Sequence, residues 1–206
     1  MEPIVTLDPD STQTARRRLM AAAKTLFSRQ GYEHTSTAAI AREAGTSESQ
    51  LVRCYHSKSG LLEAIFNESW ETLTDGIREI VVGAADAREA LSGVLQRVTE
   101  VFGRDPDLAH LLLFEGRRVR AETSQIQLSK GFVDFENLIR LLIVRGKKDG
   151  TFRPELNDEA IASTILGATE GMIRDRVMAQ RAGKESPFSD EDIRTIFFAL
   201  LKGLGR

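Results

Sequence analysis

The sequence predicts an all-α protein in which a small three-helix unit is followed by a larger helical body. Apolar residues recur at the spacing of one helix face along most of the chain, and no segment alternates as a half-buried strand does. Glycines and capping residues divide the chain into about nine helical segments. Positive charge gathers in the N-terminal part. We therefore expect two domains, residues 11–58 and residues 59–206.

The first two expected helices lie at residues 13–29 and 37–44. Gly31 ends the first, because glycine adopts the left-handed conformation that closes a helix. Ser36 or Thr35 caps the second. The apolar face of the first helix is formed by Leu19, Ala22, Ala23, Leu26 and Phe27. These positions follow the i, i+3, i+4, i+7 pattern of a buried stripe.

A third short helix is expected after Gly45, ending near Tyr55 or His56. Ser47 opens it, and Gln50 stands three residues later, which is a capping-box spacing. Six longer helices should follow. They are expected at 59–82, at 86–102, from Asp105-Pro106, at 124–148, after a cap at Asn157, and from Ser189 to the end.

Composition places the chain among ordinary soluble proteins, with 41% hydrophobic and 28% charged residues. No apolar run approaches the ~18 residues of a membrane span, so no membrane partner is expected. The first ten residues are acidic and contain two prolines, unlike a secretory or transit signal. A single cysteine, Cys54, fits a reducing compartment. We expect a cytoplasmic protein.

Net charge is uneven along the chain. Residues 11–60 contain eight Lys or Arg and three Glu, a balance of +5. Residues 61–206 contain 20 basic and 24 acidic residues, a balance of −4, and residues 1–10 add −3. The total of −2 argues against a protein covered in nucleic-acid-binding charge, but the local excess is more informative. A solvated helix face produces the same imbalance, so charge alone decides nothing.

Residues 37–56, TAAIAREAGTSESQLVRCYH, have the spacing of a helix-turn-helix. Ala41 stands fifth, and its small side chain lets two helices cross closely. Gly45 stands ninth, where the sharp turn needs a positive φ. Leu51 stands fifteenth and is apolar. A small core shared with the first helix is expected from Ile40, Ala44, Leu51 and Tyr55.

The outer face of the third helix is then left with short or hydrogen-bonding side chains. They are Ser47, Glu48, Ser49, Gln50, Arg53 and His56. Such groups contact base edges and phosphates. Arg16, Arg17 and Arg18 lie near the expected start of the first helix, placed to meet phosphate. A helical hairpin with polar, solvated faces has the same pattern, and the spacing by itself does not separate the two.

Further matches at fixed spacing favour DNA binding: the stretch resembles the N-terminal domain of TetR-type repressors over roughly residues 15–66. The matching elements are Leu26-Phe27, Gly31-Tyr32, Thr35-Ser36, Ile40-Ala41, Ala44-Gly45, Ser47, Tyr55, Ser57-Lys58 and Leu61. The resemblance implies a double-stranded DNA operator as partner. It also implies a helical domain after residue 60 that binds a small effector and dimerises, and release of the operator by that effector.

Carried onto this sequence, the resemblance implies three roles. Thr35 and Ser36 would cap the second helix and hydrogen-bond phosphate, and Lys58 would contact backbone phosphate. The major-groove face would consist of Ser47, Glu48, Ser49, Gln50 and Arg53. Two positions depart from the family pattern. Val52 replaces a tyrosine that commonly reaches phosphate, and Glu48 stands where a basic residue is frequent; its carboxylate would accept from cytosine N4 but repel phosphate.

Homodimerisation is expected through the last two helices. Small residues at 167–171 allow close approach, and the final helix has a wide apolar stripe. The alternative is that both stripes face the core of their own subunit. Candidate effector-binding residues are Trp70, Phe102, Phe114, Phe132, Phe135 and Glu170. The aromatics are more typical of a core than of a pocket, and the glutamate is equally typical of an interface rim.

No cofactor or metal site is expected, because His110 has no second ligand at metal spacing and no His/Cys cluster occurs. An enzyme is not expected either, since no Gly-rich phosphate loop, HExxH, GxSxG or CxxC is present. The sequence leaves two further functions open. One is a helical protein-interaction module that keeps the fold, and the other is an activator in place of a repressor.

Overall fold

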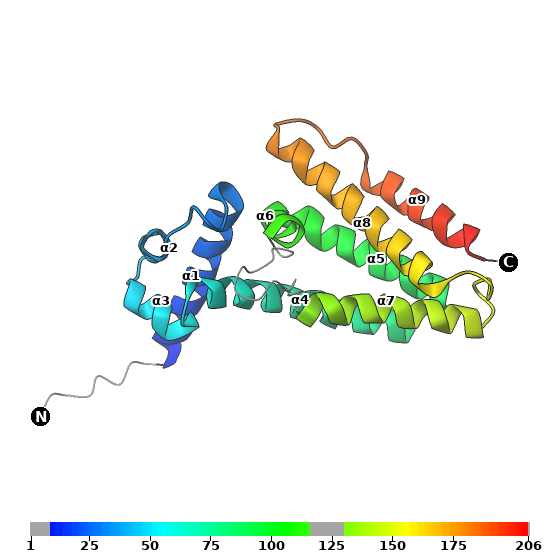
Figure 1. The fold of residues 1–206 in the computed structure, drawn as a ribbon, viewed down its shortest axis with the longest axis horizontal. Helices are drawn as coiled ribbons and strands as arrows, with labels where there is room; N and C mark the ends of the chain where they lie inside the picture. Colours follow the sequence, from blue (N-terminus) through cyan, green and yellow to red (C-terminus); the bar gives the residue numbers. More distant parts are fainter. Residues whose placement is uncertain (1–8, 116–129, 206) are drawn as a thin grey trace, which may run out of the picture. The chain divides into compact units, whose positions relative to one another are not determined.

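The computed structural model describes residues 9–115 and 130–205, with the side chains of residues 13–113 and 130–205. Within these ranges the protein is all-α, as predicted (Figure 1). The helices are α1 (Pro9–Gln30), α2 (Thr37–Glu43), α3 (Glu48–Tyr55), α4 (Lys58–Gly83), α5 (Ala87–Arg104), α6 (Pro106–His110), α7 (Lys130–Lys148), α8 (Asp158–Arg181) and α9 (Asp190–Gly203). A π-helical turn, η1 (Leu111–Glu115), follows α6. No helix in the described ranges is long and apolar enough to cross a bilayer.

The chain forms two compact units that divide between Glu68 and Ser69. The division falls inside α4, whereas the sequence placed the boundary at residue 58, where α4 begins. We call residues 1–68 the N-terminal unit and residues 69–206 the helical body.

In the N-terminal unit, α1 packs against α2 and α3, and α2 packs against α3. The expected shared core is confirmed, since Ile40, Ala44, Leu51 and Tyr55 are all buried. The two predicted glycine turns are also confirmed, with φ of 84° at Gly31 and 61° at Gly45. The short helices are therefore held by one small core and by turns that other residues resist.

The start of α1 differs from the expectation. The helix begins at Pro9, four residues before residue 13, with proline in a position where its missing N–H has no cost. Arg16, Arg17 and Arg18 consequently lie about two turns inside the helix. The helix dipole acts mainly on the first turn, so it has little effect on these arginines.

In the helical body, α5 packs against α7, α8 and α9 and forms the centre of the bundle (Figure 1). The predicted caps at Asp86, Asp105, Asn157 and Ser189 all accept from the backbone three residues on. The predicted start of one helix at Ser124 lies outside the described residues, which begin again at Lys130.

A close helix approach in the body is centred on Gly146 of α7. The ring of Phe152, fully buried after the turn that ends α7, lies directly over this glycine. A Cβ at position 146 would be 2.2 Å from Phe152 Cδ2 and 2.9 Å from Ala87 Cβ of α5. Glycine is therefore required here by packing, not by backbone conformation.

Gly146→Ala should lower the free energy of unfolding by about 1–3 kcal/mol, because a buried ring and a helix must move apart. Gly103→Ala is the matched control, since a Cβ there meets nothing within 4 Å and alanine favours the helix. Thermal unfolding of both variants at one protein concentration measures the difference. Equal melting temperatures would contradict the packing argument.

Candidate functional site

The outward face of α3 carries the residues expected to contact DNA. Leu51, Cys54 and Tyr55 turn inward and are buried. The side chains of Ser47, Glu48, Ser49, Arg53 and His56 are exposed, and that of Gln50 is half-buried. Ser47 is the N-cap, and its hydroxyl accepts from the Gln50 backbone N–H at 3.2 Å. All six expected residues thus lie on or beside one short helix.

The C-terminal end of α3 is fastened to α1 through Arg16. The Arg16 guanidinium donates to the Cys54 carbonyl at 2.7 Å and lies 4.7 Å from the centre of the Tyr55 ring. In return, the Tyr55 hydroxyl donates to the Arg16 carbonyl at 2.9 Å. These contacts fix the rotation of α3 about its own axis, and with it the set of side chains that face outward.

Burial raises the pKa of the Tyr55 phenol, an effect that the nearby Arg16 charge opposes. The phenol therefore stays protonated at neutral pH, as its role as a hydrogen-bond donor requires.

Glu48 is held at the start of α3 by a residue of α2. The Thr37 hydroxyl donates to Glu48 Oε2 at 2.6 Å, which leaves Oε1 to accept from another group. Beside it, the hydroxyls of Ser47 and Ser49 are 2.9 Å apart. Gln50 Nε2 lies 3.6 Å from the sulfur of Cys54, so this amide points toward the buried side of α3.

The structure separates Thr35 from Ser36. Ser36 is the N-cap of α2, is exposed, and accepts from the Ala39 N–H at 3.1 Å. Thr35 is buried, with 1% of its surface exposed, and its hydroxyl donates to the Gly31 carbonyl at 2.8 Å. The expected hydroxyl contact between Thr35 and phosphate does not fit this arrangement, because the hydroxyl is used to close the turn after α1.

Lys58 is also engaged inside the unit. Its ammonium donates to the carbonyls of Tyr32 and Thr35, at 2.9 and 3.0 Å, and lies 4.2 Å from the centre of the Tyr32 ring. The side chain is half-buried, with one N–H left over. Its first role is to tie α4 to the α1–α2 turn, and a phosphate contact remains a prediction.

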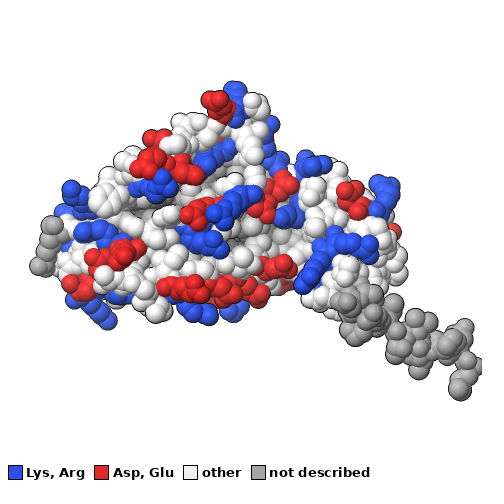
Figure 2. All heavy atoms as spheres, turned by 180° about the vertical axis from the view of Figure 1, so that it is seen from behind, with Lys and Arg blue, Asp and Glu red and all other residues white. Residues whose placement is uncertain are grey.

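Five other cations of the unit are exposed and have no ion-pair partner in the part of the chain that the structure describes. They are Arg17, Arg18, Arg29, Arg42 and Arg53. In the face drawn in Figure 2, blue side chains lie on both units, and a row of acidic side chains runs along one edge. These arginines provide the positive charge that a phosphate backbone attracts.

Val52 is a surface residue that the expected DNA-contacting set omitted. It lies on the outward face of α3 and is 51% exposed. Among the large apolar side chains described for the N-terminal unit, it is the one that is more than a third exposed. Its residue type concealed it, since the sequence reasoning selected hydrogen-bonding groups only.

The expected effector-binding aromatics are mostly interior. Trp70, Phe102 and Phe135 are buried, and the Trp70 ring lies 5.6 Å from that of Phe132 and 5.5 Å from that of Phe135. The buried Trp70 Nε1 has no acceptor within the described side chains. Glu170 is half-buried on α8. The side chain of Phe114 lies outside the described part, and the role of these residues in ligand binding stays a prediction.

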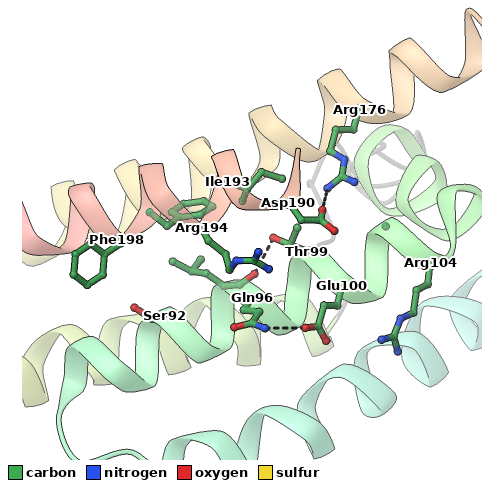
Figure 3. Close-up of a pocket in the computed structure, with 13 residues that line it drawn as sticks. Ser92, Gln96, Thr99, Glu100, Arg104, Arg176, Asp190, Ile193, Arg194 and Phe198 are labelled. Carbon is green, nitrogen blue, oxygen red and sulfur yellow. Dashed lines mark hydrogen bonds and ion pairs between the residues drawn. The ribbon is translucent and has the colours of Figure 1, made fainter. Parts of the chain in front are cut away.

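A groove that the sequence reasoning did not identify runs between α5, α8 and α9 (Figure 3). It has a volume of about 550 Å³, and a second hollow of about 260 Å³ continues it, sharing Thr99, Gly103 and Arg176. Specific ligand pockets typically have roughly 300–1,000 Å³. The apolar floor is formed by Leu95, Ile193 and Phe197, with the exposed Phe198 at the rim and Phe102, Ile173 and Val177 in the continuation.

The groove carries three arginines on its walls. Arg176 of α8 pairs with Asp190 of α9, and Arg194 pairs with Glu191 outside the lining. Arg104, near the end of α5, has no ion-pair partner among the described residues and lies apart from these pairs (Figure 3). No three His, Cys, Asp or Glu side chains of the described ranges come together as a metal site.

The sequence matches the models of two known protein-family domains. Residues 19–65 match the N-terminal domain described as "Bacterial regulatory proteins, tetR family", and residues 66–186 match "YsiA-like protein, C-terminal region". The chain belongs to the TetR family. The family consists of DNA-binding transcription regulators with an N-terminal helix-turn-helix, which agrees with the placement of α2 and α3.

The individual proteins compared with this chain are each less than 30% identical to it. The nucleoid occlusion factor SlmA of Vibrio campbellii is 29% identical over 171 residues, which cover 79% of this chain and 84% of SlmA. FadR of Bacillus subtilis, solved with stearoyl-CoA, has a TM-score of 0.80 at 18% identity, covering 92% of this chain and 99% of FadR. AibR, solved with isovaleryl-CoA and operator DNA, has a TM-score of 0.73 at 18% identity, covering 90% of this chain and 97% of AibR. At these identities the two structures show a common fold.

Proposed function

We propose that this TetR-family protein is a repressor that binds a palindromic DNA operator as a dimer and releases it when a small effector binds. The DNA-binding part of the proposal rests on the outward face of α3. This face is mainly polar and includes a cation. The same unit has exposed arginines on α1 and α2. A helix with that face enters a major groove and contacts base edges, while the surrounding cations contact phosphate.

Dimerisation through α8 and α9 is supported by the side of each helix that does not face the bundle. On α9, Ile193, Phe197 and Leu201 are buried. One turn away, Ile196 is 52% exposed and begins a stripe of apolar and small residues. That stripe is Ile196, Ala199, Leu200 and Gly203, and on α8 it is matched by Ala160, Thr164, Gly167 and Gly171. Paired α8–α9 helices from two subunits would form a four-helix interface.

The groove between α5, α8 and α9 is our candidate effector site. FadR and AibR were solved with CoA esters, which combine an apolar acyl chain with anionic phosphates. The groove offers matching chemistry, an apolar floor beside Arg104. We propose a CoA ester as the effector class, with the acyl chain on the floor and a phosphate near Arg104.

Release would follow from a population shift. The effector would bind more tightly to a subunit arrangement in which the recognition helices are wrongly spaced for the operator. Operator binding is then weakened by the difference in ligand-binding free energy between the two arrangements. A preference of about 3 kcal/mol weakens binding roughly a hundredfold. The sense of regulation depends on where the operator lies in a promoter, so activation uses the same machinery.

A second candidate function comes from SlmA, whose name describes a nucleoid occlusion factor. The similarity, 29% identity over 79% of this chain, supports nucleoid occlusion as the second candidate. A third is a helical interaction module that keeps the fold. A promoter reporter separates the candidates, because sites that bind the protein without changing expression favour the second.

The first experiment is selection of bound duplexes from a random library. An enriched inverted repeat supports the dimeric regulator and supplies the probe with which variants and ligands are compared. If folded protein enriches nothing at low salt, DNA binding is refuted and the interaction module is favoured.

Arg53→Ala should relax base preference at one position of each half-site, at about 1–3 kcal/mol for each base contact removed.

Lys58→Ala should weaken binding to all DNA sequences alike and flatten the salt dependence of binding. It should also lower the melting temperature, because the ammonium no longer binds two carbonyls. Arg78→Ala, an exposed arginine of α4, is the control. Unchanged affinity and salt response in both test variants would show that the DNA-binding face is misplaced.

Ile196→Asp should convert the dimer to monomer, because a carboxylate buried in an apolar interface costs about 3–5 kcal/mol. Light scattering measures the mass, and operator affinity should fall toward that of a single half-site. Val82→Asp is the matched control, since Val82 of α4 is 82% exposed and lies outside the proposed interface. A dimer that persists in Ile196→Asp argues for another interface.

Stearoyl-CoA and isovaleryl-CoA are the probes for the groove. At least one should raise the melting temperature of the protein and release labelled operator. Arg104→Glu should weaken that response about tenfold or more, because one charge-assisted contact is replaced by repulsion. Arg78→Glu should respond as the unaltered protein does. Equal release from both variants would place the ligand elsewhere, and failure of both probes to bind would reject this effector class.

A further inference from the structure

The apolar side chain of Val52 lies within a polar, outward-facing surface. At about 100° per residue, Val52 projects between Glu48 and Ser49 on the outward arc of α3. Arg53 lies on the other side of Ser49 in the same projection. Val52 is thus flanked by polar side chains and is itself 51% exposed.

Nothing in the fold of the N-terminal unit requires valine here. The inward arc of α3 consists of Leu51, Cys54 and Tyr55, so Val52 adds little to the core. A β-branched residue is also a poorer helix former than alanine or leucine. Among the large apolar side chains described for the N-terminal unit, Val52 is the one more than a third exposed, and it lies on the face proposed to meet DNA.

The chemistry of a major groove offers one apolar group, the C5-methyl of thymine. A phosphate would gain nothing from valine, which has no donor. A guanine or adenine edge would lose hydrogen bonds to water without replacement. The branched methyls of Val52 match only the thymine methyl among the groups exposed in the groove.

We propose that Val52 is a specificity-determining residue that contacts the C5-methyl group of one thymine in each operator half-site. The proposal rests on the proposed DNA-binding function. Because Glu48 precedes Val52 by one helical turn, the thymine lies next to the base pair that Glu48 faces. Val52 selects thymine over cytosine at that position through the methyl group, and adds nothing to affinity elsewhere.

The test replaces thymines of the selected operator with deoxyuridine, which removes the C5-methyl and keeps the base pairing. Each thymine is replaced in turn, symmetrically in both half-sites, and affinity is measured by fluorescence anisotropy. Burying one methyl group corresponds to about a fourfold change in affinity. At one thymine the affinity should therefore fall about fourfold per half-site, or about sixteenfold for the symmetric change.

Val52→Ala should remove that difference, so that thymine and deoxyuridine operators bind alike. Val82→Ala, another exposed helical valine, should keep it in full. Circular dichroism checks the fold of both variants. If Val52→Ala melts early, Val52→Thr provides the second variant, which keeps the branched shape, replaces one methyl by a hydroxyl, and should reduce the discrimination.

Two results would overturn the proposal. One is an operator that is bound specifically but in which no thymine methyl affects affinity. The other is a deoxyuridine penalty that stays the same in Val52→Ala, which would assign the methyl contact to another residue or to DNA shape. Absence of any specific operator would instead refute DNA binding itself, so the two failures are distinguishable.

Discussion

The contact between Arg16 of α1 and the end of α3 determines the functional surface of the N-terminal unit. The helix α3 has eight residues, of which Leu51, Cys54 and Tyr55 are buried. Here the guanidinium binds the Cys54 carbonyl while the Tyr55 phenol binds the Arg16 carbonyl, so the two helices are joined in both directions. With Leu51 and Tyr55 held inward, the outward residues follow from helix geometry. Burial raises the pKa of the phenol, which makes this connection independent of pH through the neutral range.

The helix boundaries were largely predictable because the signals that set them are local. A glycine with positive φ or an N-cap side chain acts within four residues, and Gly31, Gly45, Asp86 and Asn157 do so here. The division between the two units was not predictable in the same way. The helix α4 continues without interruption past Glu68, where the two units divide. That information lies in distant parts of the chain.

The candidate site shows the same limit. Periodicity placed most of the outward residues of α3, because the apolar positions of the helix mark its inward side, but it passed over the exposed Val52. It did not show that Thr35 and Lys58 are engaged by carbonyls of the turn after α1, since those bonds depend on how three elements meet. The groove was missed for a related reason. Its walls come from α5, α8 and α9, and selection of aromatics by residue type identified mainly core residues such as Trp70 and Phe135.

The helix α9 connects the two proposed functions of the body. One of its faces, with Ile193 and Phe197, forms part of the groove floor, and the adjacent face, beginning at Ile196, forms the proposed interface. A ligand that separates α9 from α5 must therefore displace the helix on which the partner subunit would rest. Because packed interfaces adopt discrete arrangements, a small displacement at the groove favours one subunit arrangement over another. Under the proposed mechanism, the spacing of the two recognition helices would change without any ligand contact to the N-terminal units, and the coupling free energy would equal the difference in ligand-binding free energy between the two arrangements.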